Sequence, residues 1–166
     1  AVLVGAGTIA ADDPQLTVRR GPGRSPARVV LDPSGRTPHA AKWLAADGAR
    51  RVFVTTAGHA APPGCDARVE VERRDGRLCP HAIVKALAGL GMRRILVEGG
   101  ARTISAFIDA GAMDRLHVLV SPMIIGSGKA GLDLAPIAAL SGALRPRTQV
   151  FPFADGDVLF DCDLKA

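Results

Sequence analysis

VLVGAGTIAADDP, residues Val2–Pro14, contains three small residues, Gly5, Gly7 and Ala10, that decide between two kinds of α/β fold. Their spacing, G-x-G-x-x-A, is that of the dinucleotide-binding fingerprint, in which glycines let backbone N–H groups approach a pyrophosphate. That fingerprint also requires a crossover helix and a second parallel strand within a unit of about 30 residues. The residues that follow therefore decide whether the motif is genuine.

The sequence after these small residues argues against a crossover helix. Pro14 disfavours helical geometry for the residue before it. Further helix-breaking residues follow at Gly21, Pro22, Gly23 and Pro26. We therefore expect a strand and a glycine-rich turn that carries Thr8 and Asp12, and no Rossmann domain. The turn is either a structural connection or a place where a flat ligand approaches the backbone, and the residues alone leave both interpretations open.

A second glycine motif lies in RRILVEGGARTISAFIDAG, Arg93–Gly111, which predicts a strand, a Glu-Gly-Gly turn and a helix. A helix N-terminus has unpaired N–H groups and a partial positive charge. Gly99 and Gly100 leave room for a phosphate to reach them, and Thr103 adds a hydroxyl donor. Glu98 would stand at the carboxyl end of the strand, where ligands collect in α/β sheets. The same glycines also suit close packing of a strand against a helix.

Short apolar runs, most of them bounded by Gly, Pro or Asp, predict the strands. They are Val2–Val4, Leu16–Val18, Arg28–Leu31, Arg51–Thr55, Arg68–Val71, Arg94–Val97, Leu116–Val120, Thr148–Phe151 and Asp157–Phe160. Helical spacing of apolar residues predicts one helix that begins at Pro80 and ends at Gly91, another over Ala101–Ala110, and a shorter piece around Ala41–Ala46. Helices lie only among the middle strands, which predicts an α/β fold whose mixed sheet is flanked by helices and finishes with antiparallel strands.

The composition is that of one domain. Its 166 residues are 48% hydrophobic, which is ample for a core. No apolar run of about 18 residues occurs, so we expect no membrane span, and the absence of a secretion signal predicts a cytoplasmic protein. Cys65, Cys79 and Cys162 lie far apart and never form C-x-x-C, which indicates reduced thiols. The histidines have no metal-ligand spacing, so we expect no metal.

The net charge of +5 comes almost entirely from scattered arginines. No block of five or more basic residues occurs and only 4% of residues are aromatic, so platforms for base stacking are poorly supplied. We therefore expect no nucleic-acid partner. The charge suits a pocket for phosphorylated small molecules. The alternative is a basic, non-catalytic domain that binds anionic polymers.

Two long blocks carry a family resemblance. VGAGTIAADDPQLTVR (Val4–Arg19) and ILVEGGARTISAFIDAGAMDRLHVLVSPMIIGSG (Ile95–Gly128) resemble the C-terminal reductase domain of the bacterial riboflavin-biosynthesis deaminase/reductase. VVLDPSGRTP, Val29–Pro38, resembles the strand and loop between them. The blocks lie in the family's order across almost the whole chain. The resemblance implies a dihydrofolate-reductase-like fold.

The resemblance also implies the residues of a site. Leu16, Arg19 and Glu98 would contact the substrate, Arg19 at its phosphate, because arginine–phosphate pairs are charge-assisted. NADPH would lie across the strand ends. The cofactor contacts would be Thr8, Asp12, Ser34 and the run Gly99, Gly100, Ala101, Arg102, Thr103, Ile104, Ser105 and Ala106.

The reaction that the resemblance implies is transfer of a hydride from NADPH to C1′ of the ribosylamino group. The substrate would be a pyrimidine of the 5-amino-6-(5-phosphoribosylamino)uracil type, reduced to the ribitylamino product in riboflavin biosynthesis. We expect no covalent nucleophile, and the proton would come from a carboxylate or from water. A reductase of another pterin or pyrimidine is an alternative within the same fold. The resemblance favours a homodimer.

The chain departs from the family pattern in two respects. The family's first strand and loop, which carry a lysine and other substrate contacts, would lie upstream of Val2. The deaminase pattern H-x-E with P-C-x-x-C is absent from the sequence. We therefore expect residues 1–166 to form a single reductase domain without its N-terminal strand and without a deaminase domain.

Overall fold

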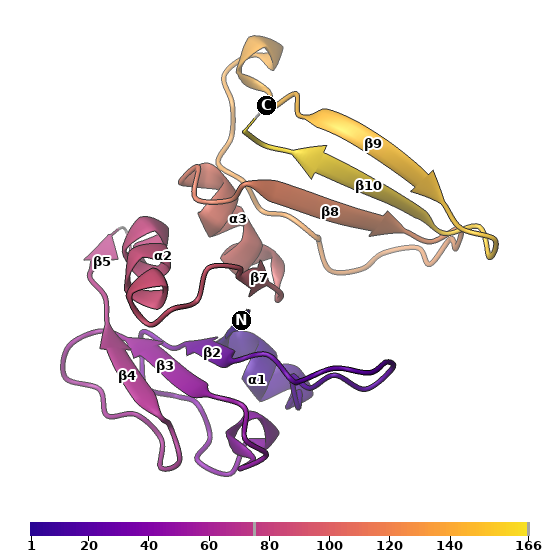
Figure 1. Cartoon of the computed structure of the whole chain (residues 1–166). Coiled ribbons are helices and arrows are strands. Elements are labelled where there is room, and N and C mark those ends of the chain that lie inside the picture. The colour runs from indigo at the N-terminus through magenta and orange to yellow at the C-terminus, as the bar shows by residue number, and fades with distance from the viewer. Residues whose placement is uncertain (75, 166) are drawn as a thin grey trace.

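The computed structural model describes residues 1–74 and 76–165, and its largest element is a five-stranded parallel sheet (Figure 1). The strands are β1 (Val2–Gly5), β2 (Arg28–Leu31), β3 (Arg51–Thr55), β4 (Ala67–Glu70) and β7 (Leu96–Val97), in the order β4-β3-β2-β1-β7. Every neighbouring pair is parallel. All four residues of β2 are buried, as expected for a strand that is covered on both faces.

One face of this sheet packs against two helices, α2 (Pro80–Gly89) and α3 (Ala101–Asp109). Leu3 and Val29 point to this face, together with Val52, and they join Leu87 of α2 and Phe107 of α3 in one apolar cluster. A proline at the first position of α2 supplies the helical φ angle without losing a hydrogen bond.

The opposite face is covered by α1 (Ala6–Asp12) and by the short 3₁₀ helix η1 (Lys42–Leu44). The residues one position along each strand, Val4, Val30 and Phe53, point to this side because side chains alternate along a strand. They pack on Ile9 of α1 and on the fully buried indole of Trp43. The period-two alternation therefore supplies two cores from the same three strands.

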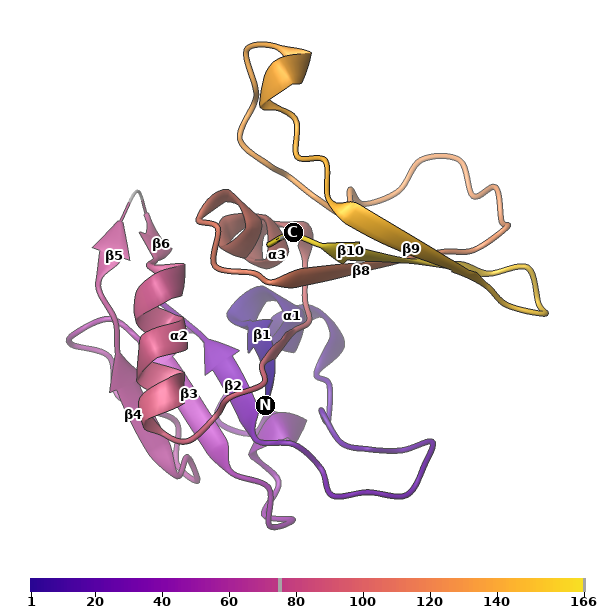
Figure 2. The ribbon, with the colours of Figure 1, turned by 45° about the horizontal axis from the view of Figure 1, so that its top comes forward.

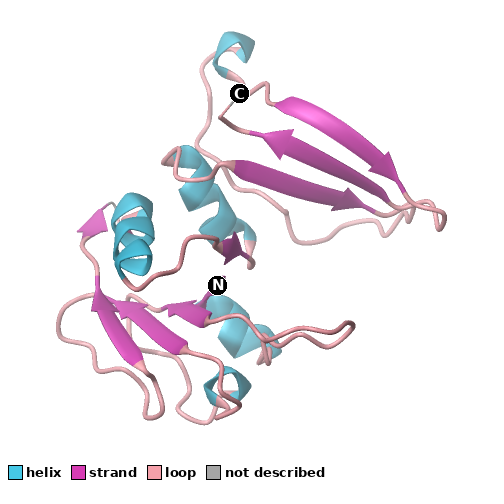
Figure 3. Ribbon diagram, viewed as in Figure 1, coloured by secondary structure: helices cyan, strands magenta, loops and turns pink. Residues whose placement is uncertain are grey.

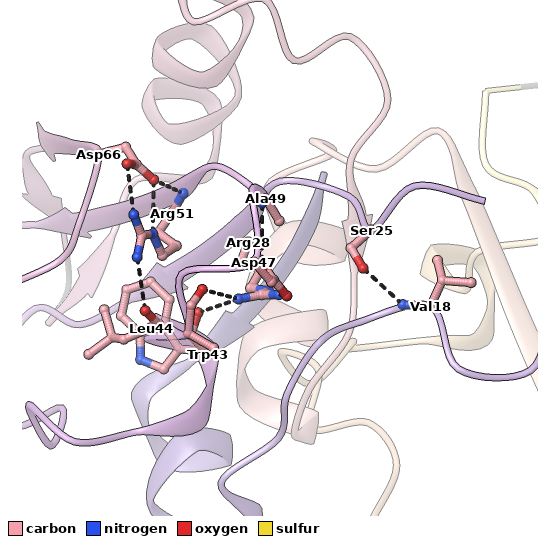
Figure 4. Close-up of polar contacts among 10 residues, drawn as sticks. Val18, Ser25, Arg28, Trp43, Leu44, Asp47, Ala49, Arg51 and Asp66 are labelled. Carbon is pink, nitrogen blue, oxygen red and sulfur yellow. Dashed lines mark hydrogen bonds and ion pairs between the residues drawn. The ribbon is translucent and has the colours of Figure 1, made fainter.

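A buried arginine attaches the loop after η1 to the sheet (Figure 4). Arg28, the first residue of β2, is fully buried. It donates to the carbonyl oxygens of Trp43 at 2.9 Å and Ala45 at 3.1 Å, and it forms an ion pair with Asp47. These contacts compensate for burying the charge, because a buried guanidinium without partners is strongly destabilising.

The last third of the chain forms a separate antiparallel sheet of three strands (Figure 3). The strands are β8 (Arg115–Val120), β9 (Arg147–Pro152) and β10 (Val158–Asp163), in the order β8-β10-β9. All six residues of β9 are exposed. A small hairpin, β5 (Arg73–Arg74) and β6 (Arg77–Leu78), follows β4, and a 3₁₀ turn, η2 (Leu140–Gly142), precedes β9.

The α/β fold class with flanking helices and antiparallel C-terminal strands is confirmed, and most predicted elements are present within a few residues. The short helix expected around Ala41–Ala46 is present as the 3₁₀ helix η1. The antiparallel strands do not extend the parallel sheet as expected but form a sheet of their own.

The expectation of a plain glycine-rich turn after β1 was wrong. Residues Ala6–Asp12 form the seven-residue helix α1, and β2 then pairs with β1 in parallel. The helix ends before Asp13, which has the left-handed conformation with φ 39°. This agrees with Pro14, which disfavours helical geometry for the residue before it. The unit keeps the βαβ order of the fingerprint, but its helix is short and a long loop, 13–27, leads to β2.

The strand expected at Leu16–Val18 is also wrong. These residues belong to the loop 13–27, and Leu16 has φ 54°, which no strand residue adopts. An apolar run of three residues does not pair unless a neighbouring strand offers it an edge. Here β2 occupies the edge of β1 that this run would need.

Candidate functional site

A cleft of about 840 Å³ lies at the carboxyl ends of the central parallel strands. Gly5 at the end of β1, Leu31 at the end of β2 and Glu98 directly after β7 line its floor. Ligands of open α/β sheets bind at this edge, and the volume lies within the usual range for cofactor pockets.

Three further segments form the walls of the cleft. The first turns of α1 and α3 both line it, with Thr8 from one helix and Arg102 from the other. The loop after β2 contributes Ser34 and Arg36, and the β5–β6 hairpin contributes Arg77. Figure 2 shows α1, α3 and the hairpin around the same end of the parallel sheet.

Most of the site residues expected from the sequence are brought together here. The cleft is lined by Thr8, Asp12, Leu16, Ser34, Glu98, Gly99, Gly100, Ala101, Arg102, Thr103 and Ala106. Arg19, Ile104 and Ser105 are not among its lining residues. The structure thus gathers both glycine motifs in one cavity, although they are far apart in the sequence.

The periodicity of α3 explains two of these exceptions. Residues three or four positions apart share a helix face, so the continuous run from Ala101 to Ala106 does not face one ligand. Ser105 is fully buried on another face, where its hydroxyl oxygen accepts a hydrogen bond from the Asp133 N–H at 2.7 Å. Arg19 lies exposed in the loop 13–27, three residues beyond Leu16, which does line the cleft.

The glycines of the two motifs have different roles. A Cβ on Gly5 would lie 2.8 Å from the Thr103 Oγ1, so this glycine lets α3 approach β1 closely. A Cβ on Gly7 or Gly100 would meet no atom within 4 Å. Gly5 therefore serves packing, whereas Gly7 and Gly100 border open space that a ligand can occupy.

The N-terminus of α3 is suited to an anion. Gly100 is the N-cap residue and makes no side-chain capping hydrogen bond to the helix. The first N–H groups of the helix have no intrahelical acceptor, although that of Thr103 donates to the Gly100 carbonyl at 3.0 Å, and the helix dipole adds positive potential there. A phosphate is the ligand for which such an end is best suited.

A buried aspartate shapes the loop after β2. Asp32 is fully buried, and its carboxylate accepts hydrogen bonds from the N–H of Ser34 at 3.0 Å and from the N–H and hydroxyl of Thr37, both at 2.7 Å. Gly35 in the middle of the loop has φ 62°, the left-handed conformation that glycine adopts without strain. The loop thus presents Ser34 and Arg36 to the cleft in a fixed conformation.

Positive charge predominates in the cleft. Five cationic side chains line it: Arg36, Arg73, Arg77, Arg102 and Lys129. Two carboxylates, Asp12 and Glu98, oppose them. An excess of cations in a concave site raises the local concentration of anionic ligands. In the described part of the chain, no group of three or more His, Cys, Asp or Glu side chains is placed to hold a metal ion.

Several cleft residues were missed in the sequence. Arg36 follows Ser34 by two positions and was detectable by the same strand-end argument that singled out Glu98. Arg73 and Arg77 had no local signal, because each strand of their hairpin is two residues long. Lys129 reaches the cleft from the long connection between β8 and β9, whose course no periodicity predicts.

A parallel sheet has a cationic cleft at its carboxyl edge, and a helix N-terminus without a side-chain cap lies in that cleft, which is the arrangement of an α/β domain suited to phosphorylated ligands. Comparison with known sequences then identifies the family. The chain belongs to the RibD C-terminal domain family, whose model matches residues 1–147.

Individual relatives agree with this assignment. The 2,5-diamino-6-ribosylamino-4(3H)-pyrimidinone 5′-phosphate reductase of Methanothermobacter thermautotrophicus is 33% identical over 136 residues, which are 76% of this chain and 61% of the relative. The riboflavin biosynthesis protein RibD of Aquifex aeolicus is 36% identical over 149 residues, 89% of this chain and 41% of the relative. The chain thus spans less than two thirds of the length of either protein.

Solved structures share the fold. The crystal structure of a diaminohydroxyphosphoribosylaminopyrimidine deaminase/5-amino-6-(5-phosphoribosylamino)uracil reductase from Thermotoga maritima matches with a TM-score of 0.75 at 30% identity, over 98% of this chain and 44% of that chain. Among the described residues of this chain, no helix has the length and apolar character needed to cross a membrane.

Proposed function

We propose that this chain is the reductase domain of a riboflavin-biosynthesis enzyme and acts in the cytoplasm. It would use NADPH to reduce a phosphoribosylamino-pyrimidine of the 5-amino-6-(5-phosphoribosylamino)uracil type to the ribitylamino product. The observation that carries the proposal is that both glycine motifs and five cationic side chains line the same cleft. Membership of a family whose relatives are named as reductases agrees with it. The three cysteines are free thiols, as suits a reducing compartment.

The cleft residues fit NADPH on two grounds. The uncapped N-terminus of α3, at Gly100–Thr103, would hold the diphosphate, with open space beside Gly100 for its oxygens. Thr8, Asp12 and Ser34 would supply the remaining polar contacts along the strand ends. When bound, the cofactor supplies the reducing equivalent, and the protein orients two ligands and excludes water.

The substrate would lie at the Leu16 and Glu98 side of the cleft. The Glu98 carboxylate would accept hydrogen bonds from N–H groups of the pyrimidine, while its own backbone N–H is held by the Leu3 carbonyl at 2.8 Å. Leu16 would cover an apolar ring face. Arg19, in the same loop as Leu16, would turn toward the cleft to pair with the substrate's phosphate.

The full domain would include a strand and loop upstream of Val2, which would add substrate contacts. Two observations support this part of the proposal. β7 and β8 are edge strands of their sheets, and edge strands offer unpaired N–H and C=O groups to another strand. Leu96 of β7 and Leu119 of β8 are 59% and 62% exposed. A version of the protein with the upstream residues should show slower amide hydrogen exchange in β7 and β8.

The protein would act as a homodimer through the antiparallel sheet. Leu119 of β8 and Phe151 of β9 flank the same residue of β10, so these two large exposed apolar side chains share one face of the sheet, and Val118 and Val150 share the other face. Contiguous apolar surface of this kind is typical of an interface. Analytical ultracentrifugation should give twice the mass of the chain, and Leu119→Glu should yield a monomer. A wild-type monomer at concentrations well above those of the assay would contradict the homodimer.

Substitution of Arg19 tests the assignment of the substrate. Arg19→Ala should weaken binding of the phosphorylated pyrimidine roughly tenfold or more, because a charge-assisted hydrogen bond to phosphate is lost, and should leave NADPH affinity unchanged. Arg20→Ala, the exposed neighbour, is the matched control. Equal losses for both ligands in the Arg19 variant would refute the phosphate assignment.

A further inference from the structure

The long connection between β8 and β9, residues 121–146, is hydrogen-bonded to helix α3. The Asp133 N–H donates to the hydroxyl oxygen of Ser105, which is fully buried, at 2.7 Å. The Ala135 N–H donates to the carboxylate of Asp109, at 3.2 and 3.3 Å from its two oxygens. Figure 1 shows the chain returning from the far end of β8 to α3 before it continues to η2. The connection is therefore attached to the body of the molecule midway along its course.

The spacing of these contacts fits a chain that runs along the helix. Ser105 and Asp109 are four residues apart, so they lie on one face of α3 and about 6 Å apart along its axis. Asp133 and Ala135 are two residues apart, and N–H groups at this spacing in an extended chain lie about 7 Å apart on the same side. The segment thus follows α3 in the same direction, and its earlier residues lie toward the N-terminal end of the helix. We call residues 129–135 the strap.

The strap is closely packed where these contacts form. Leu132 and Leu134 are each 39% exposed, which makes them the least exposed large apolar residues of the connection. On either side of the strap, Ile124 and Leu140 are 102% and 78% exposed. Apolar contact and hydrogen bonds therefore hold the same short segment, while the rest of the connection extends into solvent.

The beginning of the strap reaches the cleft. Lys129 and Ala130 both line it. Gly128 and Gly131 flank this pair, and glycine gives a chain more conformational freedom than any other residue, so the local sequence does not determine where the lysine lies. Within the described residues, no ion pair involves Lys129, so its charge is available to a ligand.

We propose that Ser105 and Asp109 are positioning residues, which hold the strap along α3 so that Lys129 faces a phosphorylated ligand and slows its release from the cleft. A lysine ammonium is a compact charge that pairs well with phosphate. The phosphate belongs either to the cofactor or to the pyrimidine. The inference rests on the proposed function for this ligand but not for the attachment of the strap. It gives Ser105 a role other than the cofactor contact that the family resemblance implies.

Amide hydrogen exchange on the ligand-free protein, followed by NMR, tests the attachment. Ser105→Ala and Asp109→Ala each remove an acceptor, so each should speed exchange of the Asp133 and Ala135 amides roughly tenfold or more. Asp109→Asn keeps an acceptor oxygen and should stay close to the wild type. The matched control is Ser141→Ala, since Ser141 is an exposed serine of the same connection, and it should change neither amide.

Stopped-flow measurement of ligand release tests the positioning of Lys129. Ser105→Ala, Asp109→Ala and Lys129→Ala should each speed release roughly three- to tenfold, because a charge-assisted contact to phosphate is lost. The measurement is made with NADPH and with the phosphorylated pyrimidine, and the ligand that is released faster is the one that Lys129 contacts. The double variant Ser105→Ala/Lys129→Ala should release it no faster than Lys129→Ala alone, because Ser105 acts through Lys129.

The outcomes separate this inference from the proposed function. Unchanged amide exchange in the Ser105 and Asp109 variants overturns the inference, as does additive acceleration in the double variant. Unchanged release of both ligands from Lys129→Ala also overturns it, and this exposed substitution leaves the core intact. If the wild type binds neither ligand, the proposed function and the role of Lys129 are overturned together, and the exchange data still decide whether α3 holds the strap.

Discussion

The two sheets of this protein differ in how completely their apolar side chains are buried. The parallel sheet is covered on both faces by elements of the same chain, and its central residues, such as Val29, Val30 and Val52, are fully buried. The antiparallel sheet leaves Leu119 62% and Val150 54% exposed. Parallel strands need crossover segments, which cover both faces as a consequence of the connectivity, whereas antiparallel strands do not. The cleft is built on the parallel sheet, whose two faces are covered by the chain itself.

Truncation of one phenylalanine in each sheet should produce the largest contrast. Phe53 of β3 is 1% exposed and Phe151 of β9 is 44% exposed. Phe53→Ala should lower the free energy of unfolding by about 3–5 kcal/mol because it leaves a cavity in the core. Phe151→Ala should cost about 1 kcal/mol or less in the monomer. Urea unfolding at low protein concentration measures both, and equal losses would contradict the contrast.

Removal of one arginine from each sheet should give the next largest difference. Arg28→Ala leaves the carbonyls of Trp43 and Ala45 without their donor and separates a partly buried ion pair, which should cost about 3 kcal/mol. Arg115 of β8 is 53% exposed and pairs with Asp161, so Arg115→Ala should change the stability by about 0.5 kcal/mol or less. Thermal unfolding of the two variants measures both changes in stability. A larger loss of stability for Arg115→Ala than for Arg28→Ala would contradict the prediction.

Two loops, one from each sheet, contain an aspartate whose carboxylate accepts backbone hydrogen bonds, and the two aspartates should differ in their effect on stability. Asp32→Asn weakens the charge-assisted bonds to Ser34 and Thr37, so it should cost about 1–3 kcal/mol and also weaken NADPH binding. Asp155 makes a similar bond, to the Asp157 N–H, in the exposed turn of the antiparallel sheet. Asp155→Asn should have little effect on stability and none on the cofactor. Unfolding and calorimetry on the same preparations measure both quantities.

The smallest effect should be a change in acid stability. Arg51 donates to both carboxylate oxygens of Asp66 through its side chain, and its backbone N–H also donates to one of them, which lowers the pKa of Asp66 to about 2 from the ordinary 3.8. Because the folded pKa lies below the unfolded one, the pair stabilises the fold above about pH 4 and this stabilisation is lost as the pH falls toward 2. Asp66 is exposed, so the change is small. Asp66→Asn should flatten the stability profile in this window only, and an unchanged acid limb would contradict the assignment.

The sequence predicted most of what depends on local pattern. Short apolar runs at Val2–Val4 and Arg28–Leu31 predicted strands, and helical spacing after Pro80 predicted α2. Most residues singled out around the two glycine motifs line one cleft, because strand ends and helix starts of an α/β sheet converge at one edge, and their roles in binding stay a prediction. The family resemblance determined which of these residues to name.

The remaining features depend on tertiary context. Helix α1 forms in a glycine-containing segment because Ile9 packs into the core beside Trp43, a contact that local propensity does not contain. Leu16–Val18 has strand-like residues but no free edge to pair with. The rotation of α3 that removes Ser105 from the cleft follows from helical geometry, which a continuous motif conceals.

The most direct test of the account is an NMR titration of isotope-labelled protein with NADPH. The central claim is that the carboxyl edge of the parallel sheet is the cofactor site and that the antiparallel sheet takes no part. Amide shift changes should concentrate at Gly99–Thr103, in α1, and in the loop from Ser34 to Thr37, and the amides of β9 should not move. Shift changes centred on β8, β9 and β10, or no changes at saturating NADPH, would contradict the claim.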